Sequence, residues 1–312
     1  MHVPLWGWAL FLVFVAGCFV VDLALGHRGD KPVSLREAAL WSGVWAGVGV
    51  LFSLVVLSLG SGEAAGEYLA GFLIEKSLSV DNIFVFAMIF AYFAVPAAAQ
   101  HRALLYGVLG ALVLRGVFIA AGASMLAAFA WTVWVLGALL VGTGIRMAVH
   151  SGGQVHPERN VVLRGMRRMV PMGTEYVGDR LWHQRAATPL LGVLTVVATT
   201  DVLFAVDSVP AVFAVTRDTF IVFAANAFSV LGLRPMYFLL ADAMERFESL
   251  KYGLSAVLIF VGAKMLLSEV VHLSVWLSLL VIVTLLATSV LVSMWVNARR
   301  SERAQAVDVQ FP

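Results

Sequence analysis

The stretch EKSLSVDN, residues 75–82, places charged side chains inside an otherwise apolar run from about Tyr68 to Phe93. A second stretch, DVLFAVDS at residues 201–208, lies inside another apolar run from about Pro189 to Val215. Each reads as an acid, five residues, an aspartate and then a small polar side chain. A carboxylate at the centre of a membrane helix costs about 2.5–3.5 kcal/mol on insertion scales, so these acids indicate a functional site.

The composition around these two stretches indicates a membrane protein. Of the 312 residues, 61% are hydrophobic and 13% are charged, whereas soluble domains average about 45–50% and about 25%. Apolar runs long enough to span a bilayer as helices recur along the chain. We therefore predict an all-α, polytopic protein of the cell inner (plasma) membrane, a single transmembrane domain over residues 1–312 in contact with the lipid bilayer.

Hydropathy divides the chain into nine predicted spans. They cover about Leu5–Leu25, Glu37–Leu59, Tyr68–Phe93, Ala103–Leu126, Trp131–Val149, Pro189–Val215, Phe220–Ala241, Gly253–Val271 and Leu273–Asn297. Lysine and arginine concentrate in alternate connections, and basic connections stay on the cytoplasmic side of a membrane. The N-terminus is therefore predicted outside and the C-terminus in the cytoplasm.

The longest connection, residues 151–188, is basic and contains VVLRGMRRMV at residues 161–170. Apolar and arginine positions there suit an amphipathic helix on the inner leaflet. A solvated topological anchor explains the same pattern, so both interpretations stay open. Because topology accounts for the basic residues, we expect no nucleic-acid partner.

The two acid-bearing spans run in opposite directions, and their similarity extends into the following spans. GVLGALVLR, ending at Arg115, parallels NAFSVLGLR, ending at Arg234. Inverted repeats with polar residues near the midplane are typical of secondary transporters. We predict a first repeat over residues 67–150 and an inverted second repeat over residues 189–272, joined by the basic connection 151–188.

The spacing of the acids restricts their geometry. Residues six apart on a regular helix lie about 240° apart, so Glu75 and Asp81 do not face one point on a straight helix. Either the helix is interrupted between them, or the acids line successive points of a path. Ser77, Ser79 and Pro210 favour local irregularity in the motif helices.

Carboxylate, amide and hydroxyl oxygens form a site for Mg²⁺, Ca²⁺ or Mn²⁺ rather than for softer metals. Cys18 is the single cysteine, which excludes an internal disulfide. The positive charges of Arg115 and Arg234 neutralise two of the four motif carboxylates. The two negative charges that remain match the charge of one divalent cation. Lys76 and Lys264 would make the site neutral if both point inward. We expect no resident cofactor; the metal is the transported ligand.

Two other interpretations of the motif acids compete with a metal site. Ion pairs could merely hold the helices together, but small-residue packing, for which Gly43 and Gly47 are candidates, joins membrane helices at lower cost. An intramembrane protease dyad of Asp81 and Asp207 leaves the other acid of each motif unexplained. We therefore expect the protein not to be an enzyme.

The motif residues resemble the TerC family of integral membrane proteins, which is named for tellurium resistance and includes Alx-type manganese exporters. The resembling stretches are EKSLSVDNIFVF (residues 75–86), QHRALLYGVLGALVLRGVFI (100–119), TTDVLFAVDSVPAVFAVTRD (199–218) and NAFSVLGLR (226–234). The resemblance implies export of a divalent cation, Mn²⁺ first, through a metal site at matching motif positions. These positions are Glu75, Asp81, Asn82, Asp201, Asp207 and Ser208.

Neighbouring polar residues are secondary candidates for the same site: Ser79, Thr200 and Asn226. Many members of the resembling family carry a further acid where this chain has Ala198, which predicts weaker affinity for the cation or a changed ion preference. The family name is a poor guide to the substrate, because tellurite is an anion and the motif carboxylates would repel it.

A divalent cation leaving the cytoplasm moves against an inside-negative potential, at about 4.6 kcal/mol per 100 mV. Export therefore needs coupling. Buried carboxylates offer it, because bound metal demands their deprotonated form. We expect proton antiport first and Na⁺ antiport second. The alternatives are a membrane metal sensor or scaffold that binds without transporting, and a Ca²⁺ or other-cation antiporter. The sequence does not determine the oligomeric state.

Overall fold

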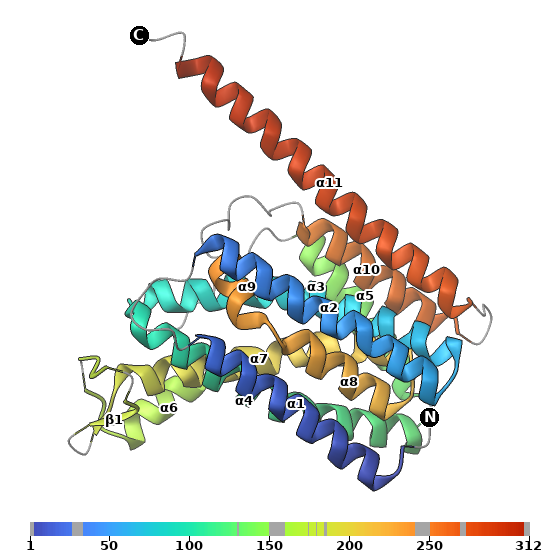
Figure 1. Cartoon of the computed structure of the whole chain (residues 1–312), viewed down its shortest axis with the longest axis horizontal. Helices are drawn as coiled ribbons and strands as arrows, with labels where there is room; N and C mark the ends of the chain where they lie inside the picture. Colours follow the sequence, from blue (N-terminus) through green and yellow to red (C-terminus); the bar gives the residue numbers. More distant parts are fainter. Residues whose placement is uncertain are drawn as a thin grey trace.

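The computed structural model describes residues 3–26, 34–129, 131–149, 160–173, 175–178, 180–183, 186–240, 250–268 and 273–308. These residues form a bundle of helices with one small hairpin (Figure 1), which confirms the all-α prediction. The helices are α1 (Leu5–Gly26), α2 (Leu35–Leu59), α3 (Gly62–Tyr92), α4 (Ala97–Ala128), α5 (Thr132–Val149), α6 (Val161–Met169), α7 (Pro189–Phe213), α8 (Thr219–Val230), α9 (Leu233–Leu240), α10 (Leu250–Leu266) and α11 (Val275–Asp308). The strands β1 (Trp182–His183) and β2 (Ala186–Ala187) pair antiparallel.

Every predicted span falls on a helix of the described chain, and the seventh falls on two, α8 and α9. Six described helices are long and apolar enough to cross a membrane, and α8 with α9 makes a seventh candidate. Neither α3 nor α10 is among them: α3 contains the charged first motif, and α10 has 17 residues. A multi-pass protein is therefore clear, while the total of nine spans stays a prediction.

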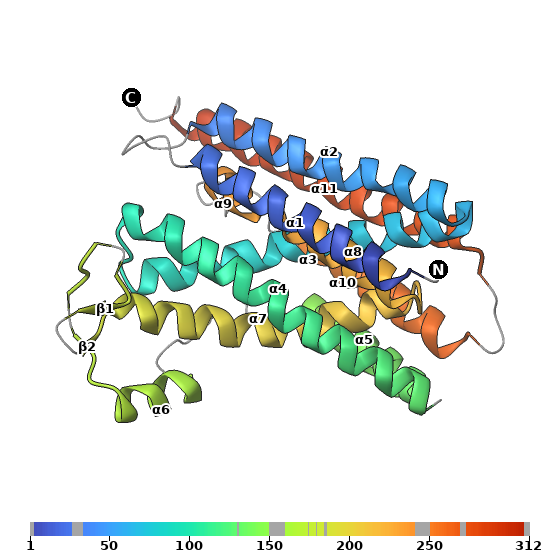
Figure 2. The same ribbon diagram turned by 60° about the horizontal axis from the view of Figure 1, so that its bottom comes forward.

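The N-terminal end of α1 and the C-terminal end of α11 lie at opposite ends of the bundle (Figures 1 and 2). The hairpin and α6 lie at the same end as the C-terminus, beside the starts of α4 and α7 (Figure 2). The hydroxyl of Tyr176 donates to the carbonyl of Phe93 at 2.8 Å, which ties this connection to the end of α3. Which end faces the cytoplasm stays a prediction.

The helices of the two motif-bearing halves interlock. α3 and α4 each pack against both α7 and α8, and α5 makes its most extensive contact with α10. α5 and α10 approach closely at Gly144: an added Cβ there would lie 3.0 Å from the carbonyl oxygen of Ser255, and the Ser255 hydroxyl donates to the Gly144 carbonyl at 2.7 Å. By contrast, an added Cβ at Gly43 or Gly47 would meet no described atom within 4 Å, so the packing role predicted for that pair is wrong within the described chain.

The amphipathic helix predicted over residues 161–170 is confirmed as α6. Asn160 caps it by accepting from the backbone N–H of Leu163 (2.9 Å), and its amide donates to Thr199 of α7 (2.7 Å). Leu163 is buried, whereas the arginines are exposed together with apolar side chains. The exposed side chains are Val161, Val162, Arg164, Arg167, Arg168 and Met169. Contact of this helix with the inner leaflet stays a prediction.

The helix irregularity predicted near the motifs is wrong, because α3 and α7 run without interruption through both of them. The break lies instead between α8 and α9, which bend by 41°. Gly232 stands at the break with φ +79°, a left-handed conformation that glycine adopts without steric cost. The first copy has Val113 at this place and Gly116 in place of Pro235, and there α4 continues unbroken.

Candidate metal site

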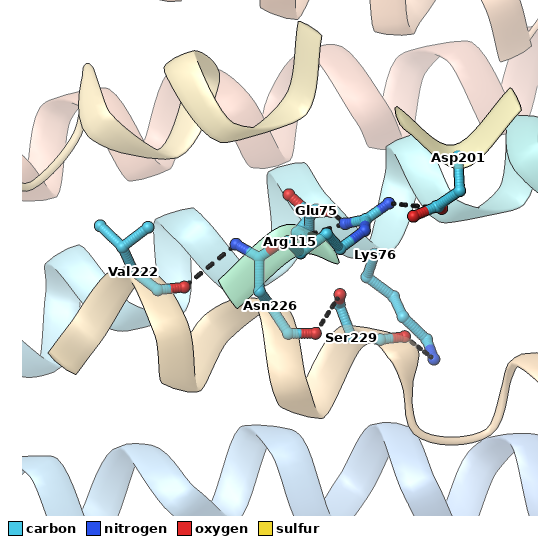
Figure 3. A network of polar contacts seen from close by, with 7 residues as sticks. All are labelled: Glu75, Lys76, Arg115, Asp201, Val222, Asn226 and Ser229. Carbon is cyan, nitrogen blue, oxygen red and sulfur yellow. Dashed lines mark hydrogen bonds and ion pairs between the residues drawn. The ribbon is translucent and has the colours of Figure 1, made fainter. Parts of the chain in front are cut away.

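A buried arginine stands between the two motifs. Arg115 of α4 forms an ion pair with Glu75 of α3, and its Nη2 lies 3.6 Å from Oδ1 of Asp201 on α7 (Figure 3). These side chains are 1%, 0% and 3% exposed, respectively. The first acid of each motif therefore meets the same guanidinium, although the two acids lie far apart in the sequence.

Two amide side chains complete this arrangement. Asn226 of α8 accepts a hydrogen bond from Arg115 Nη1 (3.1 Å) and donates one to the carbonyl of Val222 in its own helix (3.0 Å). With its amide turned so that both polar atoms are satisfied, Asn82 accepts from Arg115 Nη2 and donates to the carbonyl of Leu78, each at 3.2 Å. We name Glu75, Asn82, Arg115, Asp201 and Asn226 the Arg115 cluster.

The Arg115 cluster is not electrically balanced. One guanidinium faces two carboxylates, which leaves one negative charge when all three groups are ionised. In addition, Oε2 of Glu75 and Oδ2 of Asp201 are buried without a hydrogen-bond partner among the described residues. A buried carboxylate oxygen without a partner is unfavourable. The cluster can therefore accept a further proton or cation.

The second half of the α7 motif lies apart from this cluster. Asp207 is half-buried and accepts a hydrogen bond from Thr143 of α5 at 3.0 Å. Thr200 is buried but donates to the carbonyl of Val196 in its own helix (2.7 Å). The hydroxyls of Ser79 and Ser208 are buried without a partner in the part of the chain that the structure describes. The two motif acids of α7 thus have different polar partners, Thr143 for Asp207 and Arg115 for Asp201. Whether the acids line a path stays a prediction.

Asp81 belongs to α3, but its side chain lies outside the described residues. Among the side chains that are described, no three from histidine, cysteine, aspartate and glutamate gather closely enough to hold a metal ion. Of the predicted acids whose side chains are described, Glu75 and Asp201 meet at Arg115, whereas Asp207 contacts Thr143. Two predicted acids and two amides thus surround Arg115.

Arg234 is predicted to balance the motif acids, but the structure pairs it with an acid that we did not select. Its Nε lies 3.4 Å from Oδ2 of Asp22 on α1, and it also donates to the Asp22 carbonyl. Trp45 of α2 donates to Oδ1 of Asp22 at 2.9 Å. The sequence already indicates that Asp22 is important, because it is a carboxylate within the first apolar run.

Lys76 also points away from the Arg115 cluster. Its ammonium donates to the backbone carbonyl of Ser229 at 3.1 Å (Figure 3). It also donates to the carbonyl of Leu231 at 3.0 Å, at the break between α8 and α9. No hydrogen bond joins Lys76 to Glu75 or Asp201 among the described contacts. The ammonium thus contacts the carbonyl oxygens at the helix break rather than the motif carboxylates.

The sequence profile described as the integral membrane protein TerC family matches residues 60–301. The chain is 43% identical over 309 residues to the putative membrane-bound redox modulator Alx of Escherichia coli (strain K12), covering 95% of this chain and 96% of that protein. It is 42% identical over 303 residues to the uncharacterized membrane protein STKORF319 of Myxococcus xanthus, covering 96% and 95%. No solved structure matches the chain.

Proposed function

Because the chain belongs to the integral membrane protein TerC family, we propose that it is a secondary transporter that exports a divalent metal cation from the cytoplasm. Mn²⁺ is the first candidate, and protons moving inward are the proposed driving ions. One observation carries this proposal: Glu75 and Asp201, from the two halves of the chain, share a buried guanidinium, and each keeps a carboxylate oxygen without a hydrogen-bond partner among the described residues.

The charge of the Arg115 cluster indicates how metal and protons would exclude each other. A buried group of charges is most favourable when it is neutral overall. Arg115 together with one proton neutralises Glu75 and Asp201. A divalent cation neutralises the same two carboxylates after Arg115 withdraws. Metal binding at this cluster would therefore release one proton and separate the guanidinium of Arg115 from the two carboxylates.

The oxygen types around Arg115 fit the proposed substrate. Carboxylates and the amide oxygens of Asn82 and Asn226 are hard ligands of the kind that Mn²⁺, Ca²⁺ and Mg²⁺ accept. Asp207 with Thr143 offers a second polar point for an ion moving along α7. We propose that α3–α5 and α7–α10 are the inverted repeats and rock about the Arg115 cluster. The interlocking of α3 and α4 with α7 and α8 supports this assignment.

The orientation belongs to the same proposal. We propose that the protein lies in the cell inner membrane with its N-terminus outside, which puts α6 and the hairpin on the cytoplasmic side. Mn²⁺ would then reach the Arg115 cluster from the end of the bundle that carries the basic connection and would leave at the end that carries the N-terminus (Figure 2).

Loss of either shared carboxylate is expected to stop export. We expect Glu75→Gln and Asp201→Asn each to lower Mn²⁺ efflux from proteoliposomes by at least tenfold, because one tenfold step needs only about 1.4 kcal/mol of lost ion binding. Collapse of an imposed pH gradient is expected to stop wild-type efflux. Glu63→Gln is the matched control, because Glu63 is an exposed acid at the start of α3.

Three results would contradict this proposal. If Glu75→Gln or Asp201→Asn exports Mn²⁺ as fast as the wild type, these acids have a structural role only. Mn²⁺ binding without any flux would favour a sensor or scaffold. An efflux rate that does not depend on the pH gradient at a fixed membrane voltage would exclude proton coupling. Parallel assays with Ca²⁺ and Mg²⁺ decide which cation the protein carries.

The name of the Escherichia coli relative raises redox modulation as a second possibility. A dithiol mechanism within one chain is not favoured here, because Cys18 is the single cysteine of the sequence. Control of intracellular Mn²⁺ would influence redox balance without any thiol of the protein itself. We therefore propose metal export as the primary activity.

A further inference from the structure

The break between α8 and α9 leaves backbone carbonyls without their usual donors. In a continuous helix the carbonyl of Ser229 would accept from residue 233, and that of Leu231 would accept from residue 235. The chain turns at Gly232 instead, and Pro235 has no N–H to donate. The C-terminal end of a helix, here the end of α8, also carries a partial negative charge. This point in the bundle therefore attracts a cation.

The ammonium of Lys76 supplies that cation. Its Nζ reaches across from α3 and lies 3.1 Å from the Ser229 carbonyl oxygen (Figure 3). It also lies 3.0 Å from the Leu231 carbonyl oxygen. The carboxylate of Asp22, on α1, interacts electrostatically with the same ammonium. A positive charge thus meets two carbonyl oxygens of a broken helix, with a carboxylate in electrostatic range.

We propose that the end of α8 is a monovalent-cation site that the side chain of Lys76 fills permanently. In secondary transporters, unwound carbonyls at the ends of broken helices coordinate Na⁺. Here the chain provides its own cation at such a place, so free Na⁺ has no role there. Removal of the ammonium opens the site to Na⁺ from solution.

This inference has two parts. The binding part concerns Lys76 and the break alone and holds whether or not the protein transports a metal. The coupling part, that metal export needs no Na⁺, rests on the proposed function and removes Na⁺ antiport as its alternative. Failure of one part is distinguishable from failure of the other, because they are measured in different assays.

The binding part is tested by thermal unfolding of the purified full-length protein in NaCl and in choline chloride at equal ionic strength. We expect the wild type to unfold at the same temperature in both salts. We expect Lys76→Ala to be less stable in choline chloride and to gain about 4 °C or more in saturating NaCl. Lys76→Arg keeps a positive side chain at this place, so we expect it to unfold at the same temperature in both salts.

Lys264→Ala is the control for loss of a lysine elsewhere, on α10, and is expected to show no Na⁺ effect. If Lys76→Ala does not fold, Lys76→Met takes its place in the same comparison, because methionine keeps an apolar stem but has no charge. A wild type stabilised by Na⁺ relative to choline overturns the inference. So does a folded neutral variant of Lys76 with equal midpoints in both salts.

The coupling part is tested in proteoliposomes. We expect wild-type Mn²⁺ efflux under a pH gradient to be unchanged when choline replaces Na⁺ on both sides, and an imposed Na⁺ gradient alone to drive none. Efflux driven by the Na⁺ gradient overturns the coupling part. Absence of efflux under every gradient contradicts the proposed function, and the unfolding comparison still decides the binding part.

Discussion

Replacement of Arg115 by glutamine is expected to destabilise the metal-free protein by about 3–5 kcal/mol, which is the usual effect of removing one partner of a buried ion pair. Glu75 and Asp201 then face each other, fully buried, without a counter-charge. The measurement is the free energy of unfolding in the presence of a chelator. Arg217→Gln is the matched control, because Arg217 is exposed between the end of α7 and the start of α8.

The same variant is expected to respond to metal more strongly than the wild type. Without Arg115, two carboxylates and two amide oxygens surround a place that a divalent cation can take without displacing a guanidinium. Mn²⁺ at about 100 times its dissociation constant is expected to return about 2.7 kcal/mol of stability to Arg115→Gln. The wild type is expected to gain less at the same Mn²⁺ concentration, because the metal there competes with Arg115.

Two outcomes would refute this account of Arg115. The first is an Arg115→Gln protein as stable as the wild type in chelator, which would mean that the carboxylates are not held as charges by the guanidinium. The second is an equal Mn²⁺ effect on both proteins, which would place the metal away from the Arg115 cluster. Efflux by Arg115→Gln, measured in parallel, shows whether tighter binding slows release.

Replacement of Gly232 by valine is expected to destabilise the protein by about 2–5 kcal/mol. The left-handed backbone at φ +79° costs an L-residue about 1–2 kcal/mol. An added Cβ would also lie 2.7 Å from the Cβ of Trp45, and overpacking of this kind costs about 1–3 kcal/mol. Displacement of Trp45 would disturb its hydrogen bond to Asp22, which pairs with Arg234.

Gly43→Val on α2 is the control for this substitution, since an added Cβ there meets no described atom within 4 Å. We expect the control to stay within about 0.5 kcal/mol of the wild type. Chemical denaturation in the same detergent gives both values. A Gly232→Val protein as stable as Gly43→Val would show that the break does not depend on glycine.

The membrane helices and the importance of the motif acids could be predicted from the sequence because they are local properties. An apolar run spans a bilayer whatever it packs against, and a carboxylate within such a run is unfavourable in any arrangement. This rule predicts Glu75 and Asp201, and the repeat with its charge balance predicts Arg115; these three side chains meet in the structure. The same rule applied to the first apolar run would have selected Asp22.

Tertiary structure decided which acid meets which cation. Two similar segments end in Arg115 and Arg234, yet α4 continues unbroken while its counterpart breaks at Gly232. The second arginine pairs with Asp22 instead of the motif acids. The break also gives Lys76 its two carbonyls. Partners of this kind lie on helices distant in the sequence, and their pairing depends on the direction in which each backbone turns and on what packs beside it. Hydropathy and spacing describe one helix at a time, so they contain no information about those contacts.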